Sequence, residues 1–258
     1  MSSRSRFIWY ELATPDPAAA LAFYQAVVGW VVDDSSPPDA SYTILSASDH
    51  GVAGLTALPP EARAAGAIPA WIGYIDVADT DGTAKRMVDA GASLLRAPAD
   101  IPGVGRFAVL ADPGGAVFML LTPQPREDAT PAPDPSALGR VSWHELYAGS
   151  GQQAAFEFYA GELGWQTDEL MDIGDMGQYR LFSSDGVQLG GMMDKPPQMA
   201  VGAWGFYVNV EGIDAAVSRI QASGGQLQMG PQQVPGGRWI VRAIDPQGAA
   251  FALVSDTR

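Results

Sequence analysis

Cysteine is absent from the 258-residue chain, and histidine occurs only twice, as His50 and His144. Without cysteine the chain has no disulfide, no thiolate nucleophile and no cysteine-ligated metal site. A site of two histidines and one carboxylate would need both His50 and His144, which lie in different halves of the chain and in unmatched contexts. Both histidines are therefore interpreted as structural.

Basic residues are also scarce, with 15 Lys and Arg against 29 Asp and Glu and a net charge of −14. This balance disfavours binding to nucleic acid or to an anionic membrane surface. The N-terminus lacks the apolar stretch of a signal peptide, and no later run approaches the roughly 18 apolar residues of a membrane helix. We therefore expect a cytoplasmic protein, which would admit a neutral or cationic small molecule more readily than an anionic one unless local arginines reverse the field.

The most informative positive feature is an internal repeat. The segment FIWYELATPDPAAALAFYQAVVGW at 7–30 recurs as VSWHELYAGSGQQAAFEFYAGELGW at 141–165, and RFAVLADPGGAVFMLL at 106–121 recurs as RWIVRAIDPQGAAFALV at 238–254. A weaker repeat lies within each half, where an aromatic strand, an acidic turn and a helix ending at Gly are followed by further strands. The pattern predicts four βαβββ modules. Their approximate limits are 7–58, 70–122, 139–193 and 202–254.

The repeat also predicts the domain organisation. Residues 1–122 and 141–258 are expected to form two domains of two modules each, joined by a proline-rich linker at 123–140. With one helix for every three strands, the fold class is α+β, and each domain should be a curved antiparallel half-barrel with its helices on the outer face. The concave face of each sheet would form a cup.

Two motifs carry a family resemblance. FYQAVVGW at Phe23 and FYAGELGW at Phe158 resemble the FYxxxLGW helix end of the vicinal-oxygen-chelate superfamily, and DPGGAVF and DPQGAAF resemble its DPxGxxxE hairpin. This superfamily contains glyoxalases, bleomycin-resistance proteins and extradiol dioxygenases. The combination is most similar to a tandem-repeat subgroup labelled hydroxylase or glyoxalase-like. The resemblance implies four modules in this order over nearly the whole chain outside the linker.

The resemblance also places a divalent metal at the floor of each cup, with ligands from the first and last strands of paired modules. No position that the family motifs indicate carries a side chain that binds such a metal well. We therefore expect no metal ligand at these positions. We also expect no cofactor, unless a divalent metal site has been rebuilt from other residues. The six positions are Trp9, Ile72, Met119, Trp143, Gly205 and Ala252.

Glu11 and Glu145 follow the two matched tryptophans by two residues, so strand alternation places each Glu on the same face as its Trp. The resemblance makes this face the interior of the cup. A carboxylate there serves either as a polar anchor, a general base or a substitute metal ligand, or as a structural partner at the sheet edge. Glu11 and Glu145 are the candidate catalytic residues.

Aromatic and basic residues near the cups are the candidate ligand-binding residues. Aromatic side chains at strand spacing either form core or line a cup for a flat or cationic ligand. Arginines after the two Pro-Gly turns either bind a ligand carboxylate or phosphate, or bridge to nearby carboxylates and carbonyls. The set comprises Trp9, Tyr42, Tyr74, Arg106, Met119, Trp143, Tyr179, Tyr207 and Arg238.

Three functions fit these features. The first is a binding protein of the bleomycin-resistance type that holds a small organic molecule in metal-free cups. The second is a glyoxalase-like lyase or isomerase, or a dioxygenase, that uses Glu11 or Glu145 as base or in a rebuilt metal site. The third is a structural or regulatory protein whose cups are filled by side chains. A monomer with two cups suffices for each function, and exposed sheet edges also allow a homodimer.

Overall fold

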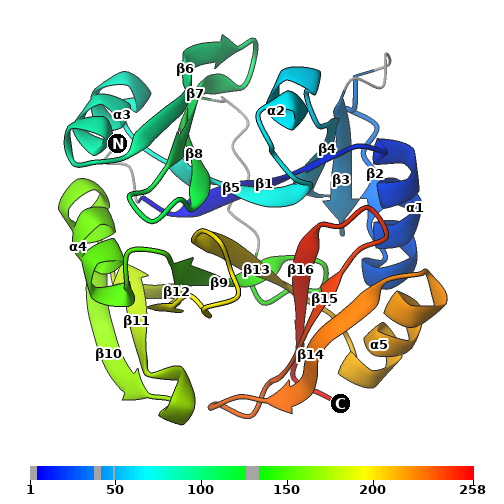
Figure 1. Cartoon of the computed structure of the whole chain (residues 1–258). Helices are drawn as coiled ribbons and strands as arrows, with labels where there is room; N and C mark the ends of the chain where they lie inside the picture. The colour runs from blue at the N-terminus through cyan, green and yellow to red at the C-terminus, as the bar shows by residue number, and fades with distance from the viewer. Residues whose placement is uncertain (1–4, 38–41, 49, 126–133) are drawn as a thin grey trace. The chain divides into compact units, whose positions relative to one another are not determined.

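The computed structural model describes residues 5–37, 42–48, 50–125 and 134–258 and contains the four predicted βαβββ modules (Figure 1). The first module comprises β1 (Phe7–Thr14), α1 (Pro17–Val28), β2 (Val31–Val32), β3 (Tyr42–Ala47) and β4 (His50–Ala57). The second comprises β5 (Ala70–Asp76), α3 (Thr80–Asp89), β6 (Ser93–Ile101), β7 (Gly105–Ala111) and β8 (Val117–Pro123).

The second half of the chain repeats this order. The third module comprises β9 (Val141–Ala148), α4 (Gln152–Leu163), β10 (Gln166–Asp172), β11 (Gln178–Ser184) and β12 (Val187–Asp194). The fourth comprises β13 (Ala203–Asn209), α5 (Ile213–Ala222), β14 (Gln226–Gln233), β15 (Trp239–Ile244) and β16 (Ala250–Ser255). Two short elements were not predicted, the helix α2 (Pro60–Ala64) and the 3₁₀ turn η1 (Gly174–Met176).

The strands form two eight-stranded sheets with matching orders, β2-β3-β4-β1-β5-β8-β7-β6 and β10-β11-β12-β9-β13-β16-β15-β14. Both sheets are mixed, whereas the sequence was interpreted as antiparallel. The first strand of each module pairs in parallel with the last, as β1 does with β4 and β9 with β12. The helix after the first strand carries the chain to a distant sheet position, and the following three strands return as an antiparallel meander. The α+β class is confirmed.

Local signals place the helices as expected. The side chain of Asp16 accepts a hydrogen bond from the backbone N–H of Ala19 at 3.0 Å and so caps α1, and Pro17 opens the helix. Gly29 ends α1 with a φ of 88°, and Gly164 ends α4 with a φ of 72°. This left-handed conformation is easily adopted only without a Cβ, which explains the glycine in both helix-end motifs.

The chain divides into two compact units that cut across the two halves of the sequence. We call the unit that contains most of the first and fourth modules the outer unit, and the unit that contains most of the second and third modules the inner unit. The divisions fall between Ile8 and Trp9, Trp71 and Ile72, Ser142 and Trp143, and Trp204 and Gly205. The domains predicted from the sequence, residues 1–122 and 141–258, stay a prediction. Of the predicted linker, residues 126–133 lie outside the described residues.

Each unit is held together by matched polar bonds between the two family motifs. In the outer unit the hydroxyl of Tyr24 on α1 donates to Asp245 Oδ2 at 3.0 Å. In the inner unit the hydroxyl of Tyr159 on α4 donates to Asp112 Oδ2 at 3.1 Å. The tyrosine of the FY pair and the aspartate of the DP turn therefore contact each other and belong to the core.

No helix in the described part of the chain is long and apolar enough to cross a membrane.

Candidate functional site

We call Trp9, Glu11 and Tyr42 the first cluster, because these residues, which were predicted to line a cup, contact one another. Trp9 and Glu11 lie two residues apart on β1, and Tyr42 begins β3. The indole Nε1 of Trp9 donates to the hydroxyl oxygen of Tyr42 at 2.8 Å. The hydroxyl of Tyr42 is in turn hydrogen-bonded to the carboxylate of Glu11. The three side chains therefore form a continuous chain of hydrogen bonds. All three are half-buried, so the cluster is partly open to solvent.

A glycine under the tyrosine makes this arrangement possible. Gly54 on β4 lies opposite Glu11 in the parallel register of β1 and β4. A Cβ at Gly54 would lie 1.9 Å from the hydroxyl oxygen of Tyr42 and 2.2 Å from its Cζ. The tyrosine ring therefore lies directly against the sheet, where any other residue at position 54 would displace it.

The second half repeats the arrangement at matched positions. We call Trp143, Glu145, Tyr147 and Tyr179 the second cluster. Trp143 Nε1 donates to the hydroxyl oxygen of Tyr179 at 2.9 Å, and that hydroxyl donates to Glu145 Oε1 at 3.1 Å. Gly191 lies opposite Glu145, and a Cβ there would lie 2.1 Å from Tyr179 Cζ. A tryptophan, a glutamate, a tyrosine and a glycine thus make the same contacts in both halves.

One difference between the clusters lies on the strand that carries the glutamate. Tyr147, two residues after Glu145, donates its hydroxyl to Glu145 Oε2. The matched position in the first half is Ala13, which has no hydroxyl. Glu145 is buried, with 9% of its surface exposed, whereas Glu11 is half-buried. The carboxylate of the second cluster is therefore more enclosed and accepts hydrogen bonds from two tyrosines on its own chain.

Burial and the adjacent carboxylates keep the tyrosines protonated. Desolvation, and then the charge of Glu11, raise the pKa of Tyr42 well above its ordinary value of 10.0. Desolvation and the charge of Glu145 raise the pKa of Tyr179 in the same way. Each phenol therefore remains a hydrogen-bond donor to its carboxylate throughout the physiological pH range.

The remaining aromatic candidates are more deeply placed. Tyr74 on β5 lies opposite Met119 on β8 in the inner unit, and these side chains are 4% and 6% exposed. Tyr207 on β13 lies opposite Ala252 on β16 in the outer unit and is 3% exposed. These residues belong to the packed sheet interior, and a role in ligand binding stays a prediction for them.

Arg106 is held by acidic side chains near the start of α3. It forms a bidentate pair with Asp81, and its Nη1 donates to Asp100 Oδ1 at 3.0 Å. These bonds to Arg106 hold the pKa of Asp81 below its ordinary value. A ligand carboxylate would have to compete with two carboxylates that already bind the guanidinium.

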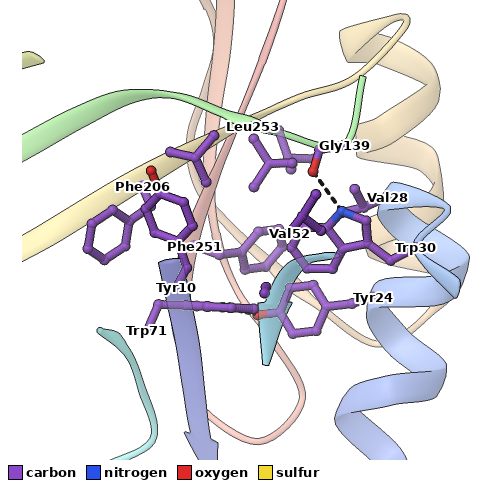
Figure 2. A pocket seen from close by; sticks show the side chains of 13 residues that line it. Tyr10, Tyr24, Val28, Trp30, Val52, Trp71, Gly139, Phe206, Phe251 and Leu253 are labelled. Carbon is purple, nitrogen blue, oxygen red and sulfur yellow. Dashed lines mark hydrogen bonds between the residues drawn. The ribbon is translucent and has the colours of Figure 1, made fainter. Parts of the chain in front are cut away.

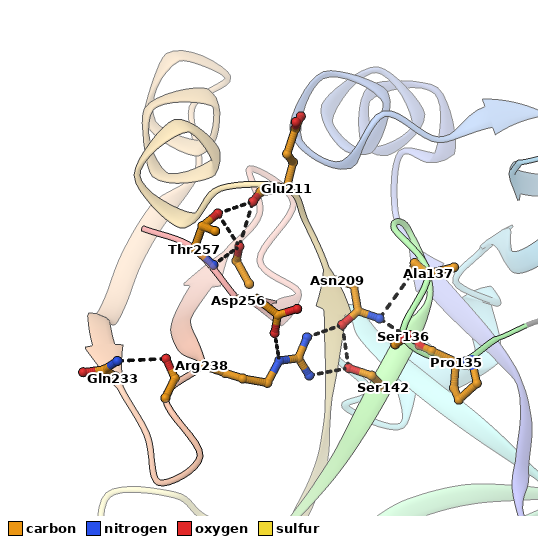
Figure 3. A network of polar contacts seen from close by, with 12 residues as sticks. Pro135, Ser136, Ala137, Ser142, Asn209, Glu211, Gln233, Arg238, Asp256 and Thr257 are labelled. Atoms are coloured by element: carbon orange, nitrogen blue, oxygen red, sulfur yellow. Dashed lines mark hydrogen bonds and ion pairs between the residues drawn. The ribbon is translucent and has the colours of Figure 1, made fainter.

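Arg238 is the centre of a polar network in the outer unit (Figure 3). Its Nε donates to Asp256 Oδ1 at 2.8 Å, and its Nη2 donates to Asn209 Oδ1 at 2.7 Å. Asn209 Nδ2 donates to the carbonyl oxygens of Pro135 and Ala137 at 2.8 Å and 3.2 Å. Arg238 thus fixes the described end of the predicted linker through Asn209, and its proposed ligand contact stays a prediction.

The two histidines lie in different settings. The ring of His144 is buried and stacks on Phe7 with a centroid distance of 4.4 Å, and its Nδ1 lies 2.6 Å from the carbonyl oxygen of Leu189. Desolvation lowers the pKa of His144 to about 4, so the ring is neutral at physiological pH. His50 is exposed at the start of β4, with Nδ1 2.8 Å from the carbonyl oxygen of Ser48.

The outer unit also contains a small apolar cavity beside α1 (Figure 2). Its volume is about 20 Å³, which is close to the space that one water molecule needs. Aromatic rings line much of it, and Trp30 Nε1 donates to the carbonyl oxygen of Gly139 at 2.7 Å. The cavity is too small for an organic ligand. Among its lining residues are Tyr10, Tyr24, Trp30, Trp71, Val141 and Phe251.

The positions that the family motifs indicate for a metal do not fit one. They carry indole, thioether, aliphatic and glycine residues, which offer none of the carboxylate or imidazole donors that divalent cations need. Across residues 5–37, 42–48, 50–125 and 134–258, no three histidine, aspartate or glutamate side chains gather in a way that could hold a metal ion. The residues at these positions are therefore not assigned to a metal site.

Two features of the clusters were not predicted from the sequence. Gly54 and Gly191 have no side chain to suggest a role, and only the strand register shows that they lie beneath a tyrosine. Tyr147 carried a visible signal, because Trp143, Glu145 and Tyr147 alternate along one strand and share one face. A search for polar residues at this spacing would have found it.

Comparison with known proteins agrees with this architecture. The family profile described as "Glyoxalase/Bleomycin resistance protein/Dioxygenase superfamily" matches residues 6–120 and 144–253. "Putative glyoxylase CFP32" from Mycobacterium bovis is 31% identical over 95% of this chain and 93% of its own length. "Anthracycline biosynthesis protein DnrV" from Streptomyces peucetius is 32% identical over 95% of this chain and 91% of its own.

Solved structures show the same fold at lower sequence identity. The 2,3-dioxygenase LapB from Pseudomonas sp. KL28 has a TM-score of 0.67 at 16% identity, covering 100% of this chain and 94% of its own. The Mn(II)-bound glyoxalase from Novosphingobium aromaticivorans has a TM-score of 0.64 at 17% identity, covering 100% of this chain and 83% of its own. At this identity the likeness concerns the fold alone.

Proposed function

Because the chain belongs to the Glyoxalase/Bleomycin resistance protein/Dioxygenase superfamily, we propose that it binds a small organic molecule at its Trp–Tyr–Glu clusters without a metal at the inherited positions. The observation that carries this proposal is the hydrogen-bond chain from Trp through Tyr to Glu, formed at matched positions in both halves. This chain of hydrogen bonds presents an oriented carboxylate beside an aromatic surface.

The physical basis is preorganisation. The carboxylate of Glu11 is held by Tyr42, and Tyr42 is held by Trp9 and by the sheet beneath it. A ligand that donates to Glu11 therefore meets a group whose orientation is already fixed, so little further ordering is lost on binding. The half-buried indole supplies apolar contact area for a flat ligand.

The electrostatic setting favours ligands with donor groups. An ionised carboxylate accepts hydrogen bonds and donates none. The chain also carries a net charge of −14, which repels anionic ligands. The two described arginine candidates are already paired with carboxylates on the same chain. Hydroxyl, amide or ammonium groups on an aromatic or cyclic framework therefore fit better than phosphates or carboxylates. Two relatives are named for anthracycline biosynthesis, and these names agree with an organic ligand.

A thermal-shift panel tests the proposal. The full chain is heated with small aromatic, quinone and α-oxoaldehyde compounds, beside the variants Glu11→Gln, Glu145→Gln and the double variant. A ligand at 100 times its Kd should raise stability by about 2.7 kcal/mol, or several degrees in Tm. We expect hits with the wild type that the double variant loses. Hits that the double variant keeps in full would show that binding takes place elsewhere.

The names of the relatives and neighbours favour a second candidate, a glyoxalase-like enzyme. In that case Glu11 or Glu145 would move a proton on the substrate. The tyrosine hydroxyls already bonded to both oxygens of Glu145 favour binding over proton transfer there, because the acceptor positions are shared with fixed donors. Turnover of an α-oxoaldehyde–thiol adduct by the wild type, absent in the double variant, would establish the enzyme instead.

A further inference from the structure

The outer unit holds a second, larger cavity between the end of α1, the predicted linker and the segment that runs from β13 into α5. Its volume is about 330 Å³, within the range of about 300 to 1,000 Å³ that is usual for small-molecule sites. Every residue that lines it belongs to the outer unit. The lining combines apolar side chains with one cation and one carboxylate. Among the lining residues are Val28, Leu138, Asn209, Val210, Glu211 and Arg219.

Arg219 on α5 brings the cation to this cavity. Its Nε donates to the carbonyl oxygen of Val27, in the last turn of α1, at 3.0 Å. Among the described residues, no carboxylate pairs with Arg219, and no acceptor is hydrogen-bonded to its two Nη groups. The side chain is half-buried. Because paired N–H groups of a guanidinium bind a carboxylate in a bidentate manner, the Nη end of Arg219 can still take such a ligand.

The matched arginine of the inner unit shows what Arg219 lacks. By the sequence repeat, Arg86 on α3 corresponds to Arg219, and Glu162 on α4 corresponds to Val27. Arg86 Nε lies 3.3 Å from Glu162 Oε2. The inner unit therefore pairs its arginine with a carboxylate of the neighbouring helix, whereas the outer unit offers only a backbone carbonyl at the matched place. A ligand can supply the missing carboxylate in the outer unit.

Glu211 lines the same cavity and carries the opposite charge. It lies between β13 and α5, and its carbonyl oxygen accepts from Ser255 Oγ at 2.9 Å and from Thr257 Oγ1 at 2.6 Å. The side chain of Glu211 is exposed and points away from Thr257 (Figure 3). It forms no ion pair with Arg219 across the cavity. The position matched to Glu211 in the inner unit is Ala78, so this carboxylate is particular to the outer unit.

From these contacts we propose that the cavity is a binding site for a small zwitterion with an apolar side chain, of the chemical class of the aliphatic amino acids. The carboxylate of the ligand accepts from the Nη groups of Arg219, as Glu162 accepts from Arg86 in the inner unit. Its ammonium donates to Glu211, and its side chain lies against Leu138. A simple anion is repelled by Glu211 and a simple cation by Arg219, so the cavity discriminates against both.

The Nε–H signal of Arg219 in ¹H–¹⁵N spectra of the full chain reports on this site, and Arg219→Gln assigns it. The probe is L-leucine. Its controls are 4-methylpentanoate, which lacks the ammonium, and 3-methylbutylamine, which lacks the carboxylate. We expect leucine to shift the Arg219 signal with saturation, and each control to bind at least tenfold more weakly.

Variants separate the two charges. Glu211→Ala introduces the residue of the inner unit and should weaken leucine binding at least tenfold without weakening that of 4-methylpentanoate. Arg219→Gln should abolish leucine binding in calorimetric titrations, whereas Arg86→Gln, the matched control, should keep it. Binding is measured rather than stability, because Arg219 also supports the end of α1. The exposed Glu211 keeps the test decisive if Arg219→Gln does not fold.

An affinity for leucine that equals the affinity for 4-methylpentanoate, or that is unchanged in Glu211→Ala, would overturn the assignment of a zwitterion. No shift of the Arg219 signal with leucine would overturn the site itself. Glu11 and Glu145 do not line this cavity, so the double variant Glu11→Gln, Glu145→Gln should bind leucine like the wild type. A loss of leucine binding in that variant would contradict a site separate from the Trp–Tyr–Glu clusters.

Discussion

The two halves of the chain place the same four residue types in the same contacts but surround them differently. Trp9, Glu11, Tyr42 and Gly54 correspond to Trp143, Glu145, Tyr179 and Gly191, and each set makes the same hydrogen bonds over the same glycine. What the halves share identifies the arrangement that the fold supports twice. What differs around it includes the second tyrosine beside Glu145, Tyr147, whose matched position carries Ala13.

The apolar cores show a second difference. In the inner unit, Phe7 stacks on His144 and lies edge-on to Trp204 at a centroid distance of 5.1 Å. By the sequence repeat, Val141 and Tyr10 take the positions of Phe7 and His144 in the outer unit, where both line the small cavity. The smaller side chain of Val141 thus borders unfilled space in the outer unit.

The largest effect on the comparison should come from the two glycines. Gly54→Ala and Gly191→Ala each place a Cβ within about 2 Å of the overlying tyrosine ring. The ring must move, and the bonds to Trp and Glu are lost with it, so we expect each variant to lose about 3 kcal/mol of unfolding free energy in urea titrations. The control is Gly51→Ala, whose Cβ would lie 3.4 Å from Trp9, an ordinary contact. Equal stabilities for all three variants would contradict the arrangement.

His144 should give the inner unit a pH dependence that the outer unit lacks. Burial lowers its pKa from 6.5 to about 4. The unfolded chain therefore takes up a proton below pH 6.5, whereas the folded chain does so only near pH 4. Stability present above pH 6.5 is lost as the pH falls toward 4, by about 3 kcal/mol at most.

The measurement compares urea unfolding of the wild type and His144→Tyr at pH 7 and pH 4.5. Tyrosine is the residue at the matched position, Tyr10. Carboxylates titrate in both proteins, so only the difference between them reports on His144. We expect the wild type to lose more stability than the variant over this interval, and identical losses would show that protonation of His144 does not oppose folding.

The tyrosines of the FY motifs should have intermediate effects of similar size in the two units. Tyr24→Phe removes the donor to Asp245, and Tyr159→Phe removes the donor to Asp112. Each change also leaves a tryptophan N–H without its acceptor, because Trp71 and Trp204 donate to these hydroxyls. We expect a loss of about 2 kcal/mol for each variant in thermal or urea unfolding. A neutral effect in one unit alone would show that the motif bonds are not equivalent.

The smallest effect should come from the cavity. Val141→Ile adds one methylene beside the space of about 20 Å³, and we expect a gain of less than about 1 kcal/mol. The calorimetric Tm of Val141→Ile is compared with that of the wild type, and a strongly destabilised variant would contradict the comparison.

Much of this fold was accessible from the sequence. The repeat and the strand compositions predicted the order of modules, because each depends on local patterns. The parallel pairing of β1 with β4 was not predicted, since it depends on where a helix returns the chain. The pairing of modules into compact units was not predicted either, because it depends on contacts between segments far apart in sequence.

The candidate site was likewise predicted from the sequence only in part. Trp9 and Glu11 were accessible because strand alternation places them together, and Tyr42 was named as a possible neighbour on its aromatic character. Gly54 was not accessible, because its role depends on the register of two strands and on the absence of a side chain. Arg106 and Arg238 were given two alternative roles, a ligand contact or a bridge to nearby carboxylates. Which carboxylates pair with them depends on the folded chain, since Asp81, Asp100 and Asp256 are not adjacent to them in sequence.

The ligand-induced shift in Tm tests the central claim most directly, when a compound from the panel is measured with and without a chelator. Binding by the clusters alone predicts a shift that is unchanged by EDTA and lost in the double variant Glu11→Gln, Glu145→Gln. A shift that EDTA abolishes, that Mn²⁺ restores and that the double variant retains would contradict it, because the ligand would then be held by a metal at another set of residues.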